Sequence, residues 1–266
     1  MEDFYIRYFT EADFCGREFT SQGILMMLCH SGRIPVNIDG KDYVLKANDL
    51  LVLPEKVPVR IGENVHQEDC TVSQLGVSTD FVLDMPSPID TNIFIYSRFR
   101  PLLSVDDEKF ADFASHFRFI AKESRETGRY RTIIIRSLVY ALLLEITAEY
   151  EDQYQFDRAE HIHDESLTDR FFRLLALNFR SQRSIGWYAS QLNITPKYLS
   201  QVVKSHTRRS IQDWIHESVL IEARMLLKTT EMTVQQISDH LNFSSPSAFV
   251  QFFRKHTGHT PGAERQ

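Results

Sequence analysis

The chain has 266 residues, of which 42% are hydrophobic and 25% are charged. This length predicts about two domains, and these proportions are ordinary for soluble globular protein. The first residues are acidic and lack the basic-then-apolar order of a signal peptide. The longest apolar stretch, residues 138–144, falls far short of the roughly 20 residues of a membrane helix. We therefore expect a cytoplasmic protein with no membrane contact.

The charge of the chain is unevenly distributed. The formal net charge of −6 does not suggest a protein that binds nucleic acid. Residues 165–266, however, carry a formal charge of +5, while the residues before them carry −11. A basic segment on an acidic body is the asymmetry typical of a DNA-binding domain attached to another domain. Taken alone, however, so modest a charge is better explained by a solvated surface.

The number and spacing of the cysteines bear on whether the chain has disulfides or a cysteine metal site. Cys15, Cys29 and Cys70 are odd in number and widely spaced, and all lie in the first third of the chain. That pattern argues against a disulfide framework and against a metal site built on paired cysteines.

Residues 1 to about 100 have the pattern of short strands. An apolar run over Ile24–Cys29 is closed by polar residues and Gly32, and Val36 and Ile38 then alternate with polar neighbours. Asp39-Gly40 has the composition of a hairpin turn, and a further apolar run ends at Pro54. These features predict an antiparallel barrel or sandwich.

Residues 106–154 have the pattern of two helices. Asp106 begins an acidic, capped first turn, and the apolar residues that follow recur at helical spacing until Gly128 breaks the pattern. The second helix has an unusually wide apolar face around Ile135, Leu142 and Ile146. So wide a face must pack against the barrel, the first helix or a second copy of the chain.

Residues 155–164 are expected to form a linker, because the sequence turns polar and acidic there. His161 and His163 lie in it without a third ligand nearby, so we interpret them as solvated side chains rather than a metal site.

The last part of the chain contains an internal repeat of two predicted helices. In the first helix of each copy, apolar or small residues occupy one face at matching positions 49 residues apart. These are Ile185, Tyr188, Ala189 and Leu192 in the first copy, and Val234, Ile237, Ser238 and Leu241 in the second. The second helices are offset by 50 residues and have apolar faces formed by Leu199, Val202 and Val203, and by Phe249, Phe252 and Phe253.

The helix starts in the two copies also match. Ser184 and Thr233 stand at equivalent N-cap positions, and Thr195-Pro196 and Ser245-Pro246 open the second helices. Between the copies, apolar spacing predicts one long helix that begins at Ser210 and ends near Thr229-Thr230. The pattern is that of two helix-turn-helix units held at a fixed distance; the alternative is a helical bundle with no DNA role.

A helix-turn-helix presents the outer side of its second helix to the major groove. The residues left on that side are expected to read base edges: Lys197, Ser200, Gln201, Lys204, Ser247, Val250, Gln251 and Arg254. The residues expected to bind the DNA backbone are Thr195, Arg208, Arg209, Ser245 and Lys255.

These motifs resemble a known family. Residues 184–200 are similar to the first half of the AraC/XylS DNA-binding domain, residues 222–227 to its linker helix, and residues 237–261 to its second half. The resemblance covers about residues 165–264 and implies a sequence-specific regulator of transcription. Three departures are Asn242 in place of a frequent Gly, a missing Arg around Val219, and Glu264 in place of a frequent Tyr.

The resemblance implies an N-terminal sensor or dimerisation domain, often a cupin-like barrel followed by helices, and residues 32–54 look like half a cupin. A domain that only dimerises, without an effector, is one alternative. A metal-dependent cupin enzyme is another, but only His30 and His66 lie in the barrel region, too few for such a site. Arg33, Arg60 and Tyr43 are candidates to meet an anionic effector, although surface roles are favoured.

The complete prediction is an α+β chain. Residues 1–154 form a cupin-like antiparallel β-barrel (about 1–100) with two helices (about 106–154), and residues 155–164 a linker. Residues 165–266 form an all-α DNA-binding domain with two helix-turn-helix units joined by a long helix. The expected partners are double-stranded promoter DNA, a small-molecule effector in the barrel and a second copy in a homodimer, with RNA polymerase left open. No cofactor, metal or catalysis is expected.

Overall fold

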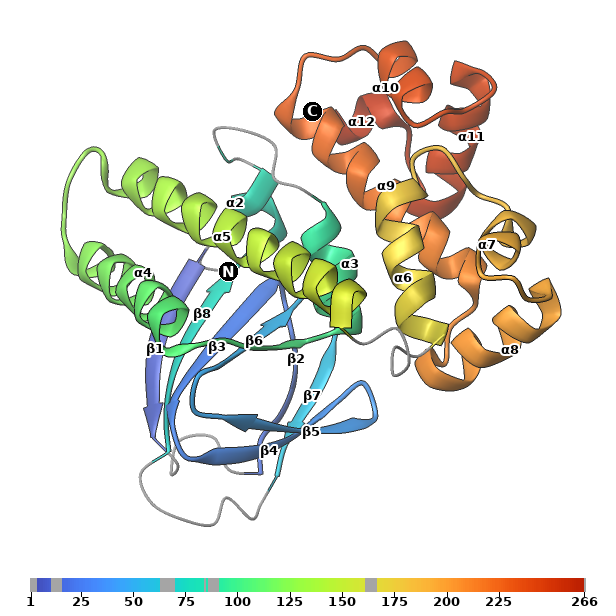
Figure 1. The fold of residues 1–266 in the computed structure, drawn as a ribbon. Helices are drawn as coiled ribbons and strands as arrows, with labels where there is room; N and C mark the ends of the chain where they lie inside the picture. The colour runs from blue at the N-terminus through green and yellow to red at the C-terminus, as the bar shows by residue number, and fades with distance from the viewer. Residues whose placement is uncertain are drawn as a thin grey trace. The chain divides into compact units, whose positions relative to one another are not determined.

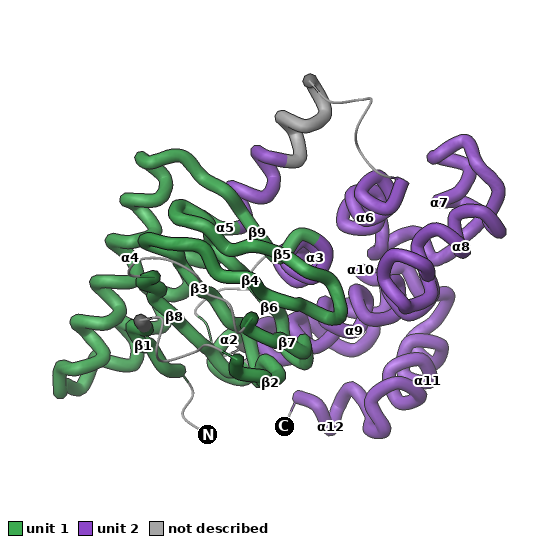
Figure 2. The backbone as a smooth tube through the Cα atoms, turned by 90° about the horizontal axis from the view of Figure 1, so that it is seen from below, with its two compact units in different colours: residues 1–89, 100–146 green, residues 90–99, 147–266 purple. Residues whose placement is uncertain are grey.

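The structure, a computed structural model, describes residues 4–10, 16–62, 70–83, 85, 91–160 and 167–265. The chain divides into two compact units, coloured green and purple in Figure 2. The first comprises residues 1–89 and 100–146, and the second comprises residues 90–99 and 147–266. Among the described helices, none has both the length and the apolar character needed to cross a membrane.

Two antiparallel sheets form the frame of the first unit (Figure 1). The five-stranded sheet has the order β1 (Phe4–Thr10), β8 (Thr71–Val77), β3 (Ile24–Ser31), β6 (Asp49–Leu53), β9 (Leu102–Ser104). The four-stranded sheet has the order β2 (Glu18–Thr20), β7 (Pro58–Ile61), β4 (Arg33–Ile38), β5 (Lys41–Lys46). The antiparallel β-structure expected for this part of the chain is confirmed.

The predicted hairpin turn joins β4 to β5. Ile38 pairs with Lys41, and both residues between them have positive φ, 51° at Asp39 and 80° at Gly40. Positive φ at both central positions fits the tight two-residue turn that matches the twist of paired strands, and Asp-Gly is a favoured sequence for it.

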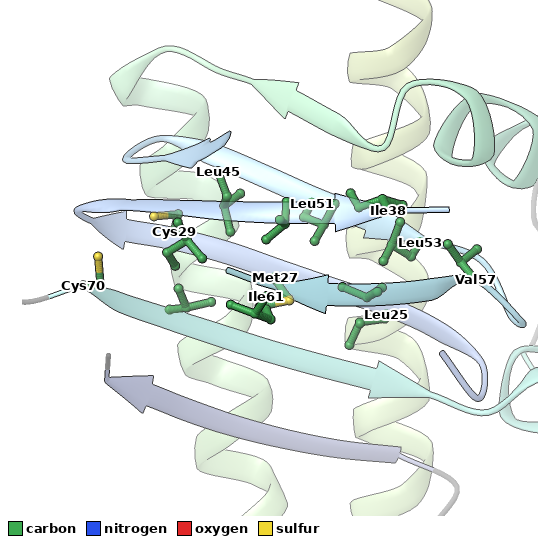
Figure 3. Close-up of a cluster of buried hydrophobic side chains, with 14 residues drawn as sticks. Leu25, Met27, Cys29, Ile38, Leu45, Leu51, Leu53, Val57, Ile61 and Cys70 are labelled. Atoms are coloured by element: carbon green, nitrogen blue, oxygen red, sulfur yellow. The ribbon is translucent and has the colours of Figure 1, made fainter. Parts of the chain in front are cut away.

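The core of the first unit lies between the two sheets, as Figure 3 shows. Leu25 and Met27 of β3 face Ile38, Leu45 and other aliphatic side chains there. Met26 and Leu28 point to the opposite face of the sheet and are also buried. Helices α4 (Asp107–Arg125) and α5 (Arg131–Glu160) cover that face (Figure 1), which explains why β3 reads as a continuous apolar run rather than an alternation.

Helices α4 and α5 begin where the sequence predicts. The Asp106 carboxylate accepts a hydrogen bond from the Lys109 amide and caps α4. Helix α5, however, continues to Glu160, into the range expected to be a linker. Residues 151–160 contain neither Gly nor Pro, so nothing in them ends the helix. His161 and His163 lie outside the described residues.

Two short helices follow β8 where the sequence suggested only barrel. Helix α2 (Thr79–Leu83) belongs to the first unit, and α3 (Asn92–Phe99) belongs to the second. The Phe99 ring stacks on Phe172 with 4.2 Å between ring centroids, and Ile93 and Tyr96 are buried. Because α3 buries these side chains among helices, residues 90–99 group with the helical unit rather than with the sheets.

The described remainder of the second unit is helical, as predicted. Its helices are α6 (Leu167–Asn178), α7 (Ile185–Gln191), α8 (Pro196–Thr207), α9 (Ile211–Thr229), α10 (Val234–His240), α11 (Pro246–Thr257) and α12 (Pro261–Arg265). Helices α7 and α8 form the first predicted helix-turn-helix, and α10 and α11 the second.

Candidate nucleic-acid interface

The two helix-turn-helix units share one turn geometry. In the first, Asn193 has φ 57° and the Ile194 amide donates to the Ala189 carbonyl at 3.0 Å. In the second, Asn242 has φ 54° and the Phe243 amide donates to the Ser238 carbonyl at 2.9 Å. Asparagine tolerates the left-handed backbone better than most residues, so Asn242 fills the place of the family's frequent Gly without disturbing the turn.

The second helices of both units start in the same way. The Thr195 hydroxyl oxygen accepts from the Tyr198 amide at 3.2 Å, and the Ser245 hydroxyl oxygen accepts from the Ala248 amide at 3.1 Å. Proline follows each cap as the first helical residue. Each hydroxyl oxygen therefore accepts a hydrogen bond from the helix, while its proton is still able to be donated to a phosphate.

The first helices differ in their caps. Thr233 and Gln236 form a reciprocal capping box at the start of α10. Ser184 holds the equivalent N-cap position of α7, but within the described residues its side chain makes no capping hydrogen bond. The predicted cap position is right, and the predicted match between the two caps is incomplete.

The second helices bury their apolar faces and expose the polar faces expected to read DNA. Leu199, Val203, Phe249 and Phe253 are each 0% exposed. The residues at the predicted base-reading positions are exposed or half-buried: Lys197, Ser200, Gln201, Lys204, Ser247, Val250, Gln251 and Arg254. The arrangement leaves donor and acceptor groups on the outer side of α8 and of α11.

The C-terminal ends of α8 and α11 are also alike. Thr207 donates to the carbonyls of Val203 and Arg209, at 2.8 and 3.2 Å. Fifty residues later, Thr257 donates to the carbonyls of Phe253 and His259, at 2.8 and 3.0 Å. The duplication therefore extends through each helix-turn-helix unit, called a reader below, and the turn that follows its second helix.

The predicted backbone-binding cations differ in how strongly they are held by the protein itself. Arg208 and Lys255 are exposed at the ends of α8 and α11. Arg209 forms an ion pair with Glu217, and its guanidinium carbon lies 4.4 Å from the Trp214 ring centroid. Arg209 would have to leave these partners to reach a phosphate.

Helix α9 joins the two readers. It starts at Ser210, whose hydroxyl and backbone amide form a capping box with Asp213, and it ends at Thr229, as the sequence predicts. The hydrogen bond from Ser210 lowers the pKa of the Asp213 carboxyl below its usual value. At 1.5 Å per residue, its 19 residues span about 28 Å, close to the roughly 34 Å between successive major-groove faces.

Arg183 connects the first reader directly to the turn of the second. Its guanidinium donates to the Asn242 carbonyl at 3.0 Å and to the Leu241 carbonyl, and it lies 4.0 Å from the Phe243 ring centroid. In return, the Asn242 side-chain amide donates to the Ser181 carbonyl at 3.1 Å. Burial lowers the pKa of Arg183 from its usual value, but an arginine stays protonated. The sequence motifs did not indicate this contact.

A buried carboxylate adds a second connection. Glu222 of α9 accepts from Arg180 at 2.9 and 3.1 Å, and its carboxylate lies 3.5 Å from His240 at the end of α10. The Thr91 hydroxyl, just before α3, also donates to Glu222. Glu222 therefore joins the segment before the first helix-turn-helix unit, the end of α10 and the residue that precedes α3. Nothing in the repeat marks Glu222 or Thr91 for this role.

The structure also shows the surroundings of the other two departures from the family pattern, at Val219 and Glu264. Val219 is 0% exposed in the core of the unit. Glu264 of α12 forms a hydrogen bond with His259 and, at 3.5 Å, an ion pair with Arg224 of α9. This carboxylate holds the end of the second reader against the linker helix.

His216 of α9 lies among cations, with its ring centroid 4.6 Å from that of His256. Burial lowers the pKa of His216, and His256, Lys255 and Arg183 lower it further, while Asp213 opposes them. The neutral imidazole is therefore favoured in the folded unit. Since the unfolded chain binds that proton at higher pH, this histidine lowers stability as the pH falls below about 6.5.

The described residues contain no group of three or more His, Cys, Asp or Glu side chains arranged to hold a metal ion. His30 instead hydrogen-bonds to the Ser73 hydroxyl at 2.6 Å, and Cys29 and Cys70 are buried free thiols. Burial raises the pKa of Cys29 to about 12, which leaves it a protonated thiol. Cys15 and His66 lie outside the described residues.

The comparison with protein families agrees with this geometry. Residues 188–266 match the model of a helix-turn-helix domain. The Arabinose operon regulatory protein of Salmonella typhimurium is 21% identical over 259 residues, which cover 95% of this chain and 86% of that protein. An uncharacterised helix-turn-helix transcriptional regulator of Bacillus subtilis, YtdP, is 27% identical over 101 residues, 38% of this chain and 13% of its own length.

Among solved structures, ToxT of Vibrio cholerae with a bound unsaturated fatty acid is similar at 12% identity. The alignment covers 100% of this chain and 95% of that one, with a TM-score of 0.37.

Removal of one side chain predicted to read a base should relax the preference for one base position. We expect Gln201→Ala to cost about 1–3 kcal/mol on the preferred sequence and little on a sequence changed at that position. Fluorescence anisotropy at fixed salt on a panel of single-base variants measures this. Lys255→Ala serves as the comparison, because a phosphate contact should weaken binding to every sequence alike. An equal loss on all sequences for Gln201→Ala would mean that Gln201 contacts the backbone.

Removal of the Arg183 side chain should destabilise the second unit. We expect Arg183→Ala to lower its free energy of unfolding by about 2–3 kcal/mol, because two carbonyls and an aromatic face lose a charged partner. Both tryptophans, Trp187 and Trp214, lie in this unit, so urea unfolding followed by tryptophan fluorescence measures it. Lys228→Ala, an exposed cation on α9, is the matched control. A change below about 0.5 kcal/mol would show that the contact does not hold the two helix-turn-helix units together.

Proposed function

We infer that this chain, an AraC-type DNA-binding regulator of transcription, recognises a promoter element made of two blocks, one for each helix-turn-helix unit. Helix α8 reads one block and α11 the other, in successive major-groove faces of the same duplex. Phosphate contacts from Lys255, Arg208 and neighbouring donors supply much of the affinity, so binding falls steeply as salt rises. Side chains on the outer faces of the two helices select the sequence.

The observation that carries this proposal is the duplication of a complete reader. Both units have the same left-handed Asn in the turn, the same capped and Pro-started second helix, and the same threonine closure at its end. A helical bundle with no DNA role needs none of these features twice. Their presence in the basic part of the chain favours two DNA readers.

The first unit is proposed to sense a small molecule. It contains a cavity of about 580 Å³, within the range of small-molecule sites. A sensor must sit in the same compartment as the chromosome, which supports a cytoplasmic location for the chain. The alternative, a first unit that only dimerises, gives the cavity no purpose. A metal-dependent enzyme is disfavoured by the protein class, and we propose no catalysis.

The second role proposed for the first unit is to pair subunits through α5. Ile133, Ile134 and Leu144 are 61%, 39% and 40% exposed on this helix. Ile134, Ala141 and Leu144, together with the polar Ser137, follow the alternating three- and four-residue spacing of the seam in a two-helix coiled coil. A homodimer formed along this seam would place four readers on the DNA, and RNA polymerase is a further candidate partner at the promoter.

Capture of fragmented genomic DNA by the full-length protein at near-physiological salt, followed by sequencing, tests the proposed function. We expect enrichment of a motif with two blocks about ten base pairs apart. The variant Gln201→Ala/Gln251→Ala, changed on the outer face of each reader, should lose the motif while it keeps its fold. Absence of enrichment with the full-length protein and with residues 165–266 would contradict the proposal.

A charge in the proposed seam should separate the subunits. We expect Ile134→Asp to shift the protein from dimer to monomer, because the seam would then bury an unpaired carboxylate. Sedimentation velocity at micromolar concentration measures the change. Leu177→Asp places the same charge at a 68% exposed aliphatic position on α6, and it should leave the dimer intact. A dimer that survives Ile134→Asp would rule out this interface.

A further inference from the structure

The cavity of the first unit lies where the two sheets open at one edge. Strand β1 begins the order of the five-stranded sheet and β2 begins that of the four-stranded sheet, and residues of both strands line the cavity. Neither edge strand bonds to the other sheet along this side in the described topology. The opening therefore gives a ligand access to the space between the sheets.

The inner end of the cavity is apolar. Leu25 and Met27 of β3 and Ile61 of β7 line it and are 3%, 2% and 1% exposed. Phe9 of β1 and Phe19 of β2 flank them, each half-buried. Aromatic and aliphatic walls on both sides favour the flat or chain-like hydrocarbon part of a ligand, which leaves water when it binds there.

The outer end of the cavity carries cations. Strand β1 turns Tyr5, Arg7 and Phe9 to the same face, so Arg7 lies between two aromatic residues where alternation would place an apolar side chain. Arg7 and Arg17 both line the cavity and are exposed to solvent. Glu18, the carboxylate among the described lining residues, forms an ion pair with Arg60. Among the described lining residues, the mouth therefore carries more positive than negative charge.

Arg7 is held in place rather than loose. Its guanidinium carbon lies 5.0 Å from the centre of the Tyr5 ring, and the Tyr5 hydroxyl accepts from the Gln74 amide at 2.9 Å. Gly76 lets the Tyr5 ring lie against β8, since a Cβ there would fall 2.4 Å from the ring. Burial raises the pKa of Tyr5, so its hydroxyl stays protonated and able to donate to an anion. A planar guanidinium stacked on a fixed ring is suited to a carboxylate.

We propose that this cavity binds an organic carboxylate with an apolar body, whose carboxylate pairs with Arg7 at the mouth and whose hydrocarbon part lies between Phe9, Phe19 and Met27. This inference rests on the proposed sensing function and names the class of effector. The sequence candidates Arg33 and Tyr43 are not among the described lining residues, and Arg60 contacts one of these residues, Glu18. The proposed partner of the ligand carboxylate, Arg7, was not indicated by any sequence motif.

Isothermal titration of the full-length protein with 4-butylbenzoate and with its neutral isostere 4-butylbenzamide tests the charge requirement. We expect the acid to bind one site per chain at least about tenfold more tightly than the amide. Arg7→Gln should bring the two affinities within about twofold, mainly by weakening the acid, and Arg7→Lys should restore part of the preference. Arg33→Gln, which removes an exposed arginine from β4 outside the cavity, should change neither affinity.

Equal binding of acid and amide to the unmodified protein would overturn the proposal, as would an acid preference that survives Arg7→Gln. Absence of binding by both compounds would overturn it too. Thermal unfolding followed by circular dichroism confirms that each variant is folded. Should Arg7→Gln fail to fold, Phe19→Ala must lower both affinities together.

Anisotropy with the captured promoter fragment separates this inference from the function on which it rests. Arg7-dependent acid binding that leaves DNA affinity unchanged would support the ligand class while it contradicts sensing by this unit. DNA binding that stays intact while no acid binds would sustain the DNA reader and overturn the ligand class.

Discussion

Two helices can read one duplex together only if the distance and angle between them are fixed, and three contacts in the second unit provide that constraint. Helix α9 is capped at Ser210 and packs against parts of both readers. Arg183 holds the carbonyls of the second reader's turn, and Asn242 of that turn returns a hydrogen bond to Ser181. Glu222 contacts both Arg180, which precedes the first reader, and His240 at the end of α10. The chain thus positions its readers before it binds DNA. The conformational entropy cost of ordering the readers is therefore not part of the free energy of binding.

The same cluster connects the linker helix to residues 91–99 of the second unit. Thr91 donates to Glu222, and the helix that follows it, α3, packs on α6 through Phe99 and Phe172. The next residues, from Arg100, belong to the first unit, where the Val52 amide donates to the Pro101 carbonyl at 2.8 Å. Residues 91–101 therefore lead from Thr91, which contacts Glu222, through α3 to the backbone of the first unit.

Much of the helical unit follows from sequence because its signals are local. Periodic apolar residues, caps such as Ser210 and Thr195, and prolines at the first helical position each act within one helical turn, so the helices begin where these residues stand. The asparagines at 193 and 242 likewise fix their turns locally. The outer faces of α8 and α11 follow once Leu199 and Phe249 are placed inward. That these faces read bases stays a prediction, since placement alone does not measure contact with DNA.

What the sequence did not indicate depends on contacts between residues far apart in the chain. Arg183 meets Leu241, and Thr91 meets Glu222, through tertiary packing that no spacing rule encodes. Arg7 sits in a strand whose pattern is too short to reveal which residues face inward until its register with β8 is known. The helix over residues 155–160 was not predicted because the composition there is polar, although no residue in that stretch ends a helix. In each case local propensity carried too little information, and packing decided.

The most direct test of a rigid pair of readers is binding to a series of DNA duplexes in which base pairs are inserted between the two blocks. Affinity measured at fixed salt should fall at least about tenfold with five inserted base pairs, which turn the second block to the opposite face of the duplex. It should stay low with ten, because α9 cannot stretch from about 28 Å to reach a block one further turn away. Recovery of full affinity at ten base pairs would show that the readers are flexibly joined, and would contradict the constraint placed on Arg183, Glu222 and α9.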